Sequence, residues 1–141
     1  MRERLSNLIA VHTAKRAYSK NGRYSEDKYS GSMDIRPSDV ALETQTHQLI
    51  RPHPETGCLG VFGGSYVQDF EGISPEKAET FKNELGEWLA RPEFVYRHKW
   101  EKNMLVLWDN RCVLHRATGG YEGFDRLLHR LTIADDKAYY L

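Results

Sequence analysis

Basic and imidazole side chains gather in the stretch "LWDNRCVLHRATGGYEGFDRLLHRLTI", residues 107–133. The glycine-rich "TGGYEG" inside it predicts an antiparallel hairpin that turns around residues 119–122. His115 then faces about position 126, which is Arg126, and directly opposed side chains lie roughly 4.5–5.5 Å apart at Cβ. Because side chains alternate along a strand, Arg126 and Arg130 share one face. One histidine and two arginines could therefore line the same surface.

Such a surface has a coherent chemical use. A neutral imidazole can bind a metal, and a neighbouring guanidinium can hold the carboxylate of an anionic ligand chelated to that metal. The second arginine could hold an anionic group of a second ligand. A hairpin with solvated basic residues fits the same spacing, and the spacing alone does not decide between a site and a solvated face.

Composition limits the classes of partner. The chain has 141 residues, which suits one compact domain, and its 20 Lys and Arg balance its 20 Asp and Glu. No charge excess favours nucleic acid, no apolar run approaches the roughly 20 residues of a membrane span, and the N-terminus lacks the apolar region of a secretory signal. We therefore expect a cytoplasmic protein with a small-molecule partner. Cys58 and Cys112 form no metal-binding pair, and we expect both to be buried, reduced packing residues.

Helical spacing appears in two places. In residues 2–17, the positions of Leu5, Leu8, Ile9 and His12 predict an amphipathic helix. A second helix is predicted from Ser74, a suitable N-cap, with Pro75 at its first position and Pro92 ending it. Its apolar face would hold Phe81, Leu85, Trp88 and Leu89. The polar stretch between these helices, residues 18–40, predicts a flexible surface loop.

Strands are predicted for most of the remaining chain. Residues 40–50 indicate a short extended or mixed segment, and residues 58–70 a β-rich segment with a bend at Gly63-Gly64. In the last fifty residues, "FVYRHKW" and "NMLVLWDN" flank a turn at residues 101–103, and "RCVLHRA" and "RLLHRLTIAD" flank the glycine-rich turn. The pattern predicts a mainly β protein with helices (α+β), built as an antiparallel sheet, sandwich or jelly roll.

The block "WDNRCVLHRA…YEGFDRLLHRLTI" closely resembles the C-terminal signature of the taurine dioxygenase family, which are Fe(II)- and 2-oxoglutarate-dependent oxygenases. The segments "MRERLSNLIAVH", "IRPHPETGCLGVFGG" and "GISPEKAETFKNELGEWLARPEFVYRHKW" resemble successive parts of the same family in the same order. The resemblance implies a double-stranded β-helix (jelly-roll) fold, with Fe(II) as cofactor, 2-oxoglutarate and O2 as cosubstrates and ascorbate as a supporting reductant. It also implies hydroxylation of a small anionic substrate with release of succinate and CO2.

The resemblance assigns roles residue by residue. His115 matches the distal histidine of the iron-binding triad, and Arg126 matches the arginine that pairs with the far carboxylate of 2-oxoglutarate. Arg130 matches a position that holds the anionic head group of the substrate. Trp108 matches a tryptophan of the pocket near the cosubstrate, with core packing as the alternative. His129 has the opposite strand parity to Arg130, so we expect it to be structural.

The first two iron ligands of the family form a His-x-Asp/Glu motif upstream of the distal histidine. The formal match here, His53-Pro54-Glu55, corresponds to a turn of the family, "HP-x-TG", and we reject it as the metal motif. We expect the true motif to fall before Met1, so that residues 1–141 are the C-terminal portion of a single dioxygenase domain whose N-terminal strands are missing. Exposed sheet edges would then favour a homo-oligomer. The alternative is a truncated, non-enzymatic oligomeric fragment.

Overall fold

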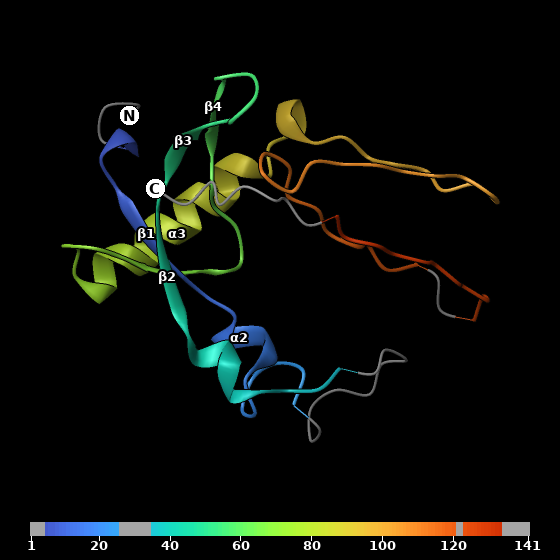
Figure 1. The fold of residues 1–141 in the computed structure, drawn as a ribbon, viewed down its shortest axis with the longest axis horizontal. Coiled ribbons are helices and arrows are strands. Elements are labelled where there is room, and N and C mark those ends of the chain that lie inside the picture. Colours follow the sequence, from blue (N-terminus) through green and yellow to red (C-terminus); the bar gives the residue numbers. More distant parts are fainter. Residues whose placement is uncertain (1–4, 26–34, 121–122, 134–141) are drawn as a thin grey trace.

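A three-stranded antiparallel sheet in the order β2-β1-β5 forms the centre of the fold (Figure 1). The structure is a computed structural model that describes residues 5–25, 35–120 and 123–133. Its strands are β1 (Ile9–Thr13), β2 (Thr44–Gln48) and β5 (Val67–Phe70). The register pairs Ala10 with both His47 and Phe70, so β1 is hydrogen-bonded on both edges.

The predicted helix over residues 2–17 is wrong for most of its length. Leu5 and Ser6 are helical, but residues 9–13 form β1, which the short helix α2 (Lys15–Tyr18) follows. Val11 and Thr13 are β-branched and favour extended backbone, and pairing with two neighbouring strands outweighs the helical spacing of the apolar residues. Leu5 and Leu8 do pack against the core, but from the segment that leads into β1.

A second, two-stranded sheet continues the path of β2. It pairs β3 (Ile50–Pro52) with β4 (Leu59–Val61), and the turn between them spans residues 53–58. Leu49 joins the two sheets because its N–H donates to Leu8 O and its C=O accepts from Phe62 N. Leu49 is fully buried. The expected extended or mixed segment at 40–50 and the β-rich segment at 58–70 are confirmed, with the 3-10 turn η1 (Asp39–Leu42) preceding β2.

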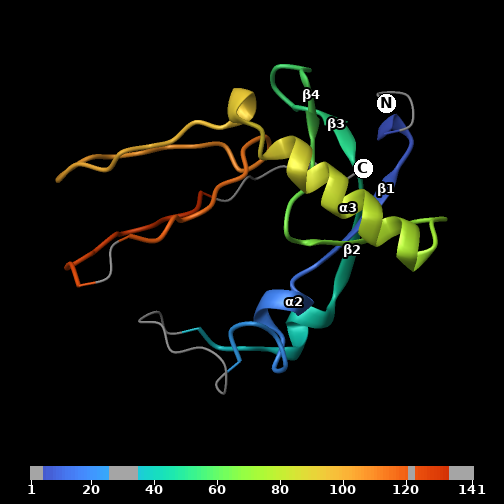
Figure 2. The same ribbon diagram turned by 180° about the vertical axis from the view of Figure 1, so that it is seen from behind.

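Helix α3 (Pro75–Leu89) lies across one face of the sheet, as Figure 2 shows. The predicted helix is confirmed: Ser74 is the N-cap residue and Pro75 the first helical residue, although the Ser74 hydroxyl makes no capping hydrogen bond. Phe81 meets Phe70 of β5 edge to face, with ring centroids 5.0 Å apart. The buried core consists of residues from β1, β5, α3 and the Leu49 junction: Ala10, Leu49, Val67, Phe70, Ala78 and Leu85.

Part of the predicted loop at 18–40 is folded back on α2. The N–H groups of Arg23 and Tyr24 donate to the carbonyl oxygens of Arg16 and Ala17, which holds residues 19–25 in successive turns. Ser19 and Ser25 are buried there. Residues 26–34 lie outside the described part of the chain.

Beyond η2 (Pro92–Phe94), the chain forms two long arms that each run out and back from the body (Figure 1). The first arm comprises residues 95–108, and the second arm comprises residues 111–120 and 123–133. The first arm turns at residues 101–104 as predicted, with Asn103 at a φ of 64° and Met104 N donating to Glu101 O. The described residues of both arms are extended but form no strand ladder, so the paired strands predicted here are absent from this part of the structure.

Apolar side chains on the arms are exposed to solvent because no described helix or strand packs over them. Leu105 is 92% exposed, Leu131 95% and Ile133 86%. A strand buries its apolar side chains only when a second layer packs on that face. Among the described residues, no helix is both long and apolar enough to span a membrane.

Candidate functional site

Three of the four predicted site residues lie together at the base of the arms. The indole of Trp108 and the imidazole of His115 have ring centroids 5.0 Å apart, at an interplanar angle of 52°. The guanidinium carbon of Arg130 lies 6.0 Å from the centre of the Trp108 ring, at the outer limit of a cation–π contact. Trp108 is half-buried, and its indole N–H donates to Asn110 Oδ1 at 2.9 Å.

Arg126 lies on the return limb of the second arm and is exposed. No ladder joins the two limbs among the described residues, so the facing of His115 and Arg126 across a hairpin stays a prediction. Arg130 belongs to the same limb and lies near enough to Tyr18 to lower the pKa of that phenol, although burial and a hydrogen bond with Tyr66 raise it overall. His129, expected to be structural, is exposed.

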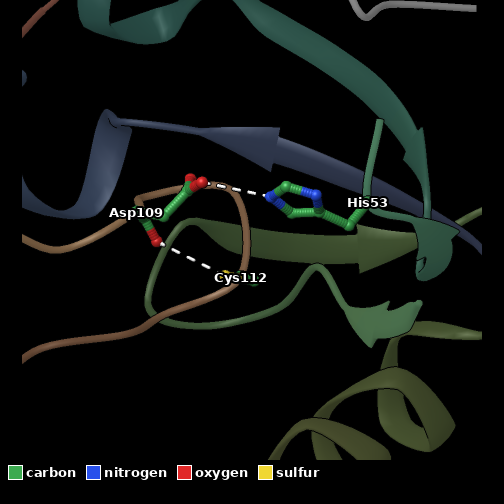
Figure 3. Close-up of side chains that lie close together, drawn as sticks. All are labelled: His53, Asp109 and Cys112. Carbon is green, nitrogen blue, oxygen red and sulfur yellow. Dashed lines mark hydrogen bonds and ion pairs between the residues drawn. The ribbon is translucent and has the colours of Figure 1, made fainter. Parts of the chain in front are cut away.

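The arms are joined to the body by a group of polar side chains that we call the hairpin bridge: His53, Glu55, Asp109 and Arg111. Figure 3 shows the bond between His53 and Asp109 within it. His53 and Glu55 lie in the β3–β4 turn, and Asp109 and Arg111 lie where the first arm meets the second. Asp109 Oδ2 lies 3.1 Å from His53 Nε2 and 2.7 Å from the Arg111 guanidinium. Arg111 also donates to Glu55 Oε1 at 3.1 Å.

The hydrogen bonds of the His53 ring determine its tautomer. Nδ1 accepts from the backbone N–H groups of Glu55 and Thr56, at 3.3 and 3.4 Å. An imidazole nitrogen that accepts carries no proton, so the neutral ring holds its proton on Nε2 and donates it to Asp109. Both ring nitrogens are therefore engaged in the turn and the bridge.

Charge distribution across the bridge favours an ionised Asp109. Hydrogen bonds from the Arg111 side chain and backbone, followed by the bond from His53, hold the pKa of the Asp109 carboxyl well below its usual range. The same carboxylate raises the pKa of Arg111 further above its ordinary value. Because donors already occupy both oxygens of Asp109, the carboxylate has little capacity left for another ligand.

The described residues offer one group of three metal-ligating side chains, His53, Asp109 and Cys112, whose ligand atoms lie within 4.8 Å of one another. Cys112 Sγ donates to Asp109 O at 3.8 Å (Figure 3). Three features oppose a cation here. His53 Nε2 carries a proton and cannot donate its lone pair to a metal, and the Arg111 guanidinium already occupies the Asp109 carboxylate. The positive charge of this guanidinium would also repel a cation. His115 is not a member of this group, so the described residues do not assemble a complete iron site around it.

Two sequence expectations in this region have different outcomes. The rejection of His53 and Glu55 as iron ligands stays a prediction, and in the structure both side chains bind residues of the turn between the arms. The expectation that Cys58 and Cys112 are buried is wrong, since both thiols are free and exposed. Cys58 lies in the β3–β4 turn and Cys112 in the turn between the arms, and neither turn packs against the core.

Sequence reasoning missed the hairpin bridge. It joins residues separated by 56 positions, and a spacing pattern within one segment carries no information on such a contact. The one available signal was the Asp109-Asn110-Arg111 order, since an acidic and a basic side chain two residues apart in a turn can pair locally.

Comparison with known proteins places this chain in a family. Residues 1–132 match the model described as "Taurine catabolism dioxygenase TauD, TfdA family". The chain belongs to this family. It is 40% identical over 137 residues to the alpha-ketoglutarate-dependent 2,4-dichlorophenoxyacetate dioxygenase of Cupriavidus pinatubonensis, covering 96% of this chain and 45% of that protein.

Two further relatives agree with this assignment. The (S)-phenoxypropionate/alpha-ketoglutarate-dioxygenase of Sphingobium herbicidovorans is 30% identical over 141 residues, covering 98% of this chain and 47% of that protein. A crystal structure of a putative alpha-ketoglutarate-dependent 2,4-D dioxygenase from Burkholderia xenovorans superposes with a TM-score of 0.62 at 25% identity, over 79% of this chain and 40% of that one. The chain thus has part of a jelly-roll oxygenase fold. It spans about half the length of these relatives.

Proposed function

We propose that this chain serves an Fe(II)- and 2-oxoglutarate-dependent dioxygenase that hydroxylates a small anionic organic substrate and releases succinate and CO2. The observation that carries the proposal is the gathering of Trp108, His115 and Arg130 at the base of the arms. These residues belong to the block that resembles the family signature, and the names of the relatives support an enzyme over a non-catalytic fragment.

Each residue has a role that its chemistry suits. His115 would bind iron through a neutral imidazole nitrogen, and Arg126 would pair its planar fork with the far carboxylate of 2-oxoglutarate. Trp108 would form an apolar wall beside His115 that limits the movement of the imidazole and keeps water away from one side of it. Arg130, next to that wall, would bind the anionic group of the substrate.

The iron ligands within the described residues are incomplete. A 2-His-1-carboxylate site needs two more ligands on one face with His115, and the described residues place none there. The activity that we propose is therefore that of the chain together with a segment that brings a His-x-Asp pair, and the chain by itself should bind iron weakly.

The substrate class follows from Arg130 and from the relatives. Phenoxypropionate and dichlorophenoxyacetate, after which two of the relatives are named, are both carboxylates. A guanidinium pairs with a carboxylate, a sulfonate or a sulfate ester through two parallel hydrogen bonds. We accordingly propose a small organic anion of this kind as the substrate.

The test uses a chimera in which this chain replaces the matching part of the Cupriavidus relative. We expect Fe(II)- and 2-oxoglutarate-dependent formation of succinate, with a loss of about 100-fold or more in the Arg126→Ala variant because a desolvated bidentate ion pair disappears. Arg116→Ala, an exposed arginine of the same arm, is the matched control and should retain activity. Unchanged turnover in Arg126→Ala would contradict the assignment of Arg126 as the residue that pairs with 2-oxoglutarate.

We further propose a cytoplasmic location, which the two free, exposed thiols support, because exposed cysteines persist as thiols in reducing compartments. Ascorbate as a supporting reductant and a homo-oligomeric state belong to the same proposal. Activity measured with and without ascorbate, and light scattering on the purified chain, address these two points.

A further inference from the structure

Two residues of the hairpin bridge, Asp109 and Arg111, lie in the sequence between the site residues Trp108 and His115. Asp109 directly follows Trp108, and its carbonyl oxygen accepts from Cys112 N at 3.3 Å and from Val113 N at 3.0 Å. These bonds close the turn that reverses the first arm into the second. The shape of this turn therefore decides whether the Trp108 and His115 rings meet.

Among the described residues, hydrogen bonds and an apolar contact tie this turn to the body. The bridge reaches the β3–β4 turn through His53 and Glu55, and Leu114 packs onto Gly64. Farther out, the described residues of the arms are extended without a ladder. The Leu114 contact is apolar, and apolar contacts do not fix direction. The orientation of the turn must come mainly from the hydrogen bonds of the bridge.

Within the bridge, His53 is the most buried side chain. Its side chain is only 13% exposed, against 34% for Asp109 and 67% for Glu55. Two backbone N–H groups of the β3–β4 turn donate to His53 Nδ1. These bonds orient the imidazole, and therefore its Nε2–H, independently of Asp109. The exposed Arg111–Glu55 pair is a weaker tether because solvent screens it.

We propose that His53 is a positioning residue for His115: its Nε2–H holds Asp109, and Asp109 sets the turn that places the His115 imidazole against Trp108. The inference rests on the proposed function only in naming His115 as the iron ligand. The contact between the two rings is a property of the chain itself, so it can be measured without iron, 2-oxoglutarate or turnover.

Two substitutions separate the two functions of the His53 ring. His53→Asn keeps an acceptor near the position of Nδ1, which preserves the β3–β4 turn, but it removes the donor that reaches Asp109. His53→Gln keeps a donor near the position of Nε2 and gives up the Nδ1 acceptor. The readout is the set of NOEs between the Trp108 indole and the His115 imidazole in NMR spectra of the chain, together with the chemical shifts of the His115 ring protons.

We expect His53→Asn to lose the Trp108–His115 NOEs and to move the His115 ring shifts to those of a solvated histidine, whereas His53→Gln retains both signals. Wild-type NOEs in His53→Asn would overturn the proposal, as would equal loss in both variants, because the donor to Asp109 would then not be the deciding group. Amide exchange in β1 and β2 reports whether each variant remains folded.

Should His53→Asn fail to fold, Asp109→Ala tests the same bond from the other side. This variant leaves residues 53–58 unchanged and removes the carboxylate that His53 Nε2–H holds. We expect the same loss of NOEs, and retention of the NOEs in this folded variant would overturn the proposal. Absence of turnover in the chimera, by contrast, would remove the proposed function and leave the ring contact unaffected.

Discussion

The side chain of Leu114 lies directly over Gly64, so closely that a Cβ built on this glycine would stand 2.9 Å from Leu114 Cδ2. Gly64 also has a φ of 111°, a conformation that L-residues rarely adopt. The second arm thus meets the body at a point where only the smallest residue fits. Together with the hairpin bridge, this contact determines where the second arm leaves the core.

Replacing Gly64 with alanine should therefore destabilise the fold and displace the second arm. We expect a loss of about 1–3 kcal/mol in the free energy of unfolding, because backbone strain and a steric clash with Leu114 add to each other. Urea denaturation followed by circular dichroism measures this loss.

Gly72→Ala is the matched control for that experiment. Gly72 has a φ of 72°, but a Cβ there would meet nothing within 4 Å, so the variant reports backbone strain alone. A Gly64→Ala variant that is no less stable than Gly72→Ala would show that Leu114 does not press on Gly64 in solution.

The elements that sequence analysis predicted correctly have strong local signals. Helix α3 has an N-cap, an N1 proline and an apolar face, so local chemistry and packing indicate the same helix. Residues 9–13 lack this agreement: the apolar spacing indicated a helix, while the pairing of β1 with β2 and β5, which no local pattern contains, made a strand. The long-range pairing of β1 with its two neighbours therefore outweighed the helical spacing of its apolar residues.

In the candidate site, too, local features were predicted and long-range contacts were not. The motif around Trp108, His115 and Arg130 is local, and the structure brings these three residues together. The hairpin bridge joins His53 to Asp109 across the chain, and this link was not foreseeable from spacing. Exposed Cys58 and Cys112 were misjudged because cysteine is commonly buried, whereas these two occupy turns that do not face the core.

Truncating the core side of α3 should cost far more than truncating its outer face. Leu85 is 9% exposed and belongs to the core cluster beneath the sheet. Leu85→Ala should lower the free energy of unfolding by about 2–5 kcal/mol through lost burial and a residual cavity. Glu84→Ala, one residue away on the exposed side, should change it by less than about 0.5 kcal/mol. Equal effects in the two variants would contradict the packing of α3 described above.

The uncovered faces of the arms should make the isolated chain self-associate. Leu107 is 83% exposed and Leu131 95%, and burial of one such side chain contributes about 1.5–3 kcal/mol. Leu131→Lys should weaken association by about tenfold or more, as read by size-exclusion chromatography with light scattering. Thr132→Lys adds the same charge one residue away and should have little effect. A monomeric wild-type chain at high concentration would refute this expectation.

His12 gives the fold a dependence on pH that is independent of the site. Its ring stacks on Phe62 at a centroid distance of 5.1 Å and meets His47 edge-on at 5.1 Å, and its Nε2 is buried with no hydrogen-bond partner among the described residues. Burial, followed by the nearby His47 and Arg51, lowers the pKa of His12 from 6.5 to about 4. The folded state therefore holds this imidazole neutral where the unfolded chain would protonate it.

Because the unfolded state binds the proton first, the His12 contribution to stability is complete above pH 6.5 and is lost as the pH falls from 6.5 to about 4. Allowing for partial exposure of the ring, we expect a decrease on the order of 1–3 kcal/mol across this window. His12→Phe keeps a ring against Phe62 but cannot titrate, so urea denaturation at a series of pH values should show a flatter profile. His129→Phe, at an exposed histidine, should retain the wild-type slope, and an unchanged slope in His12→Phe would rule out His12 as its source.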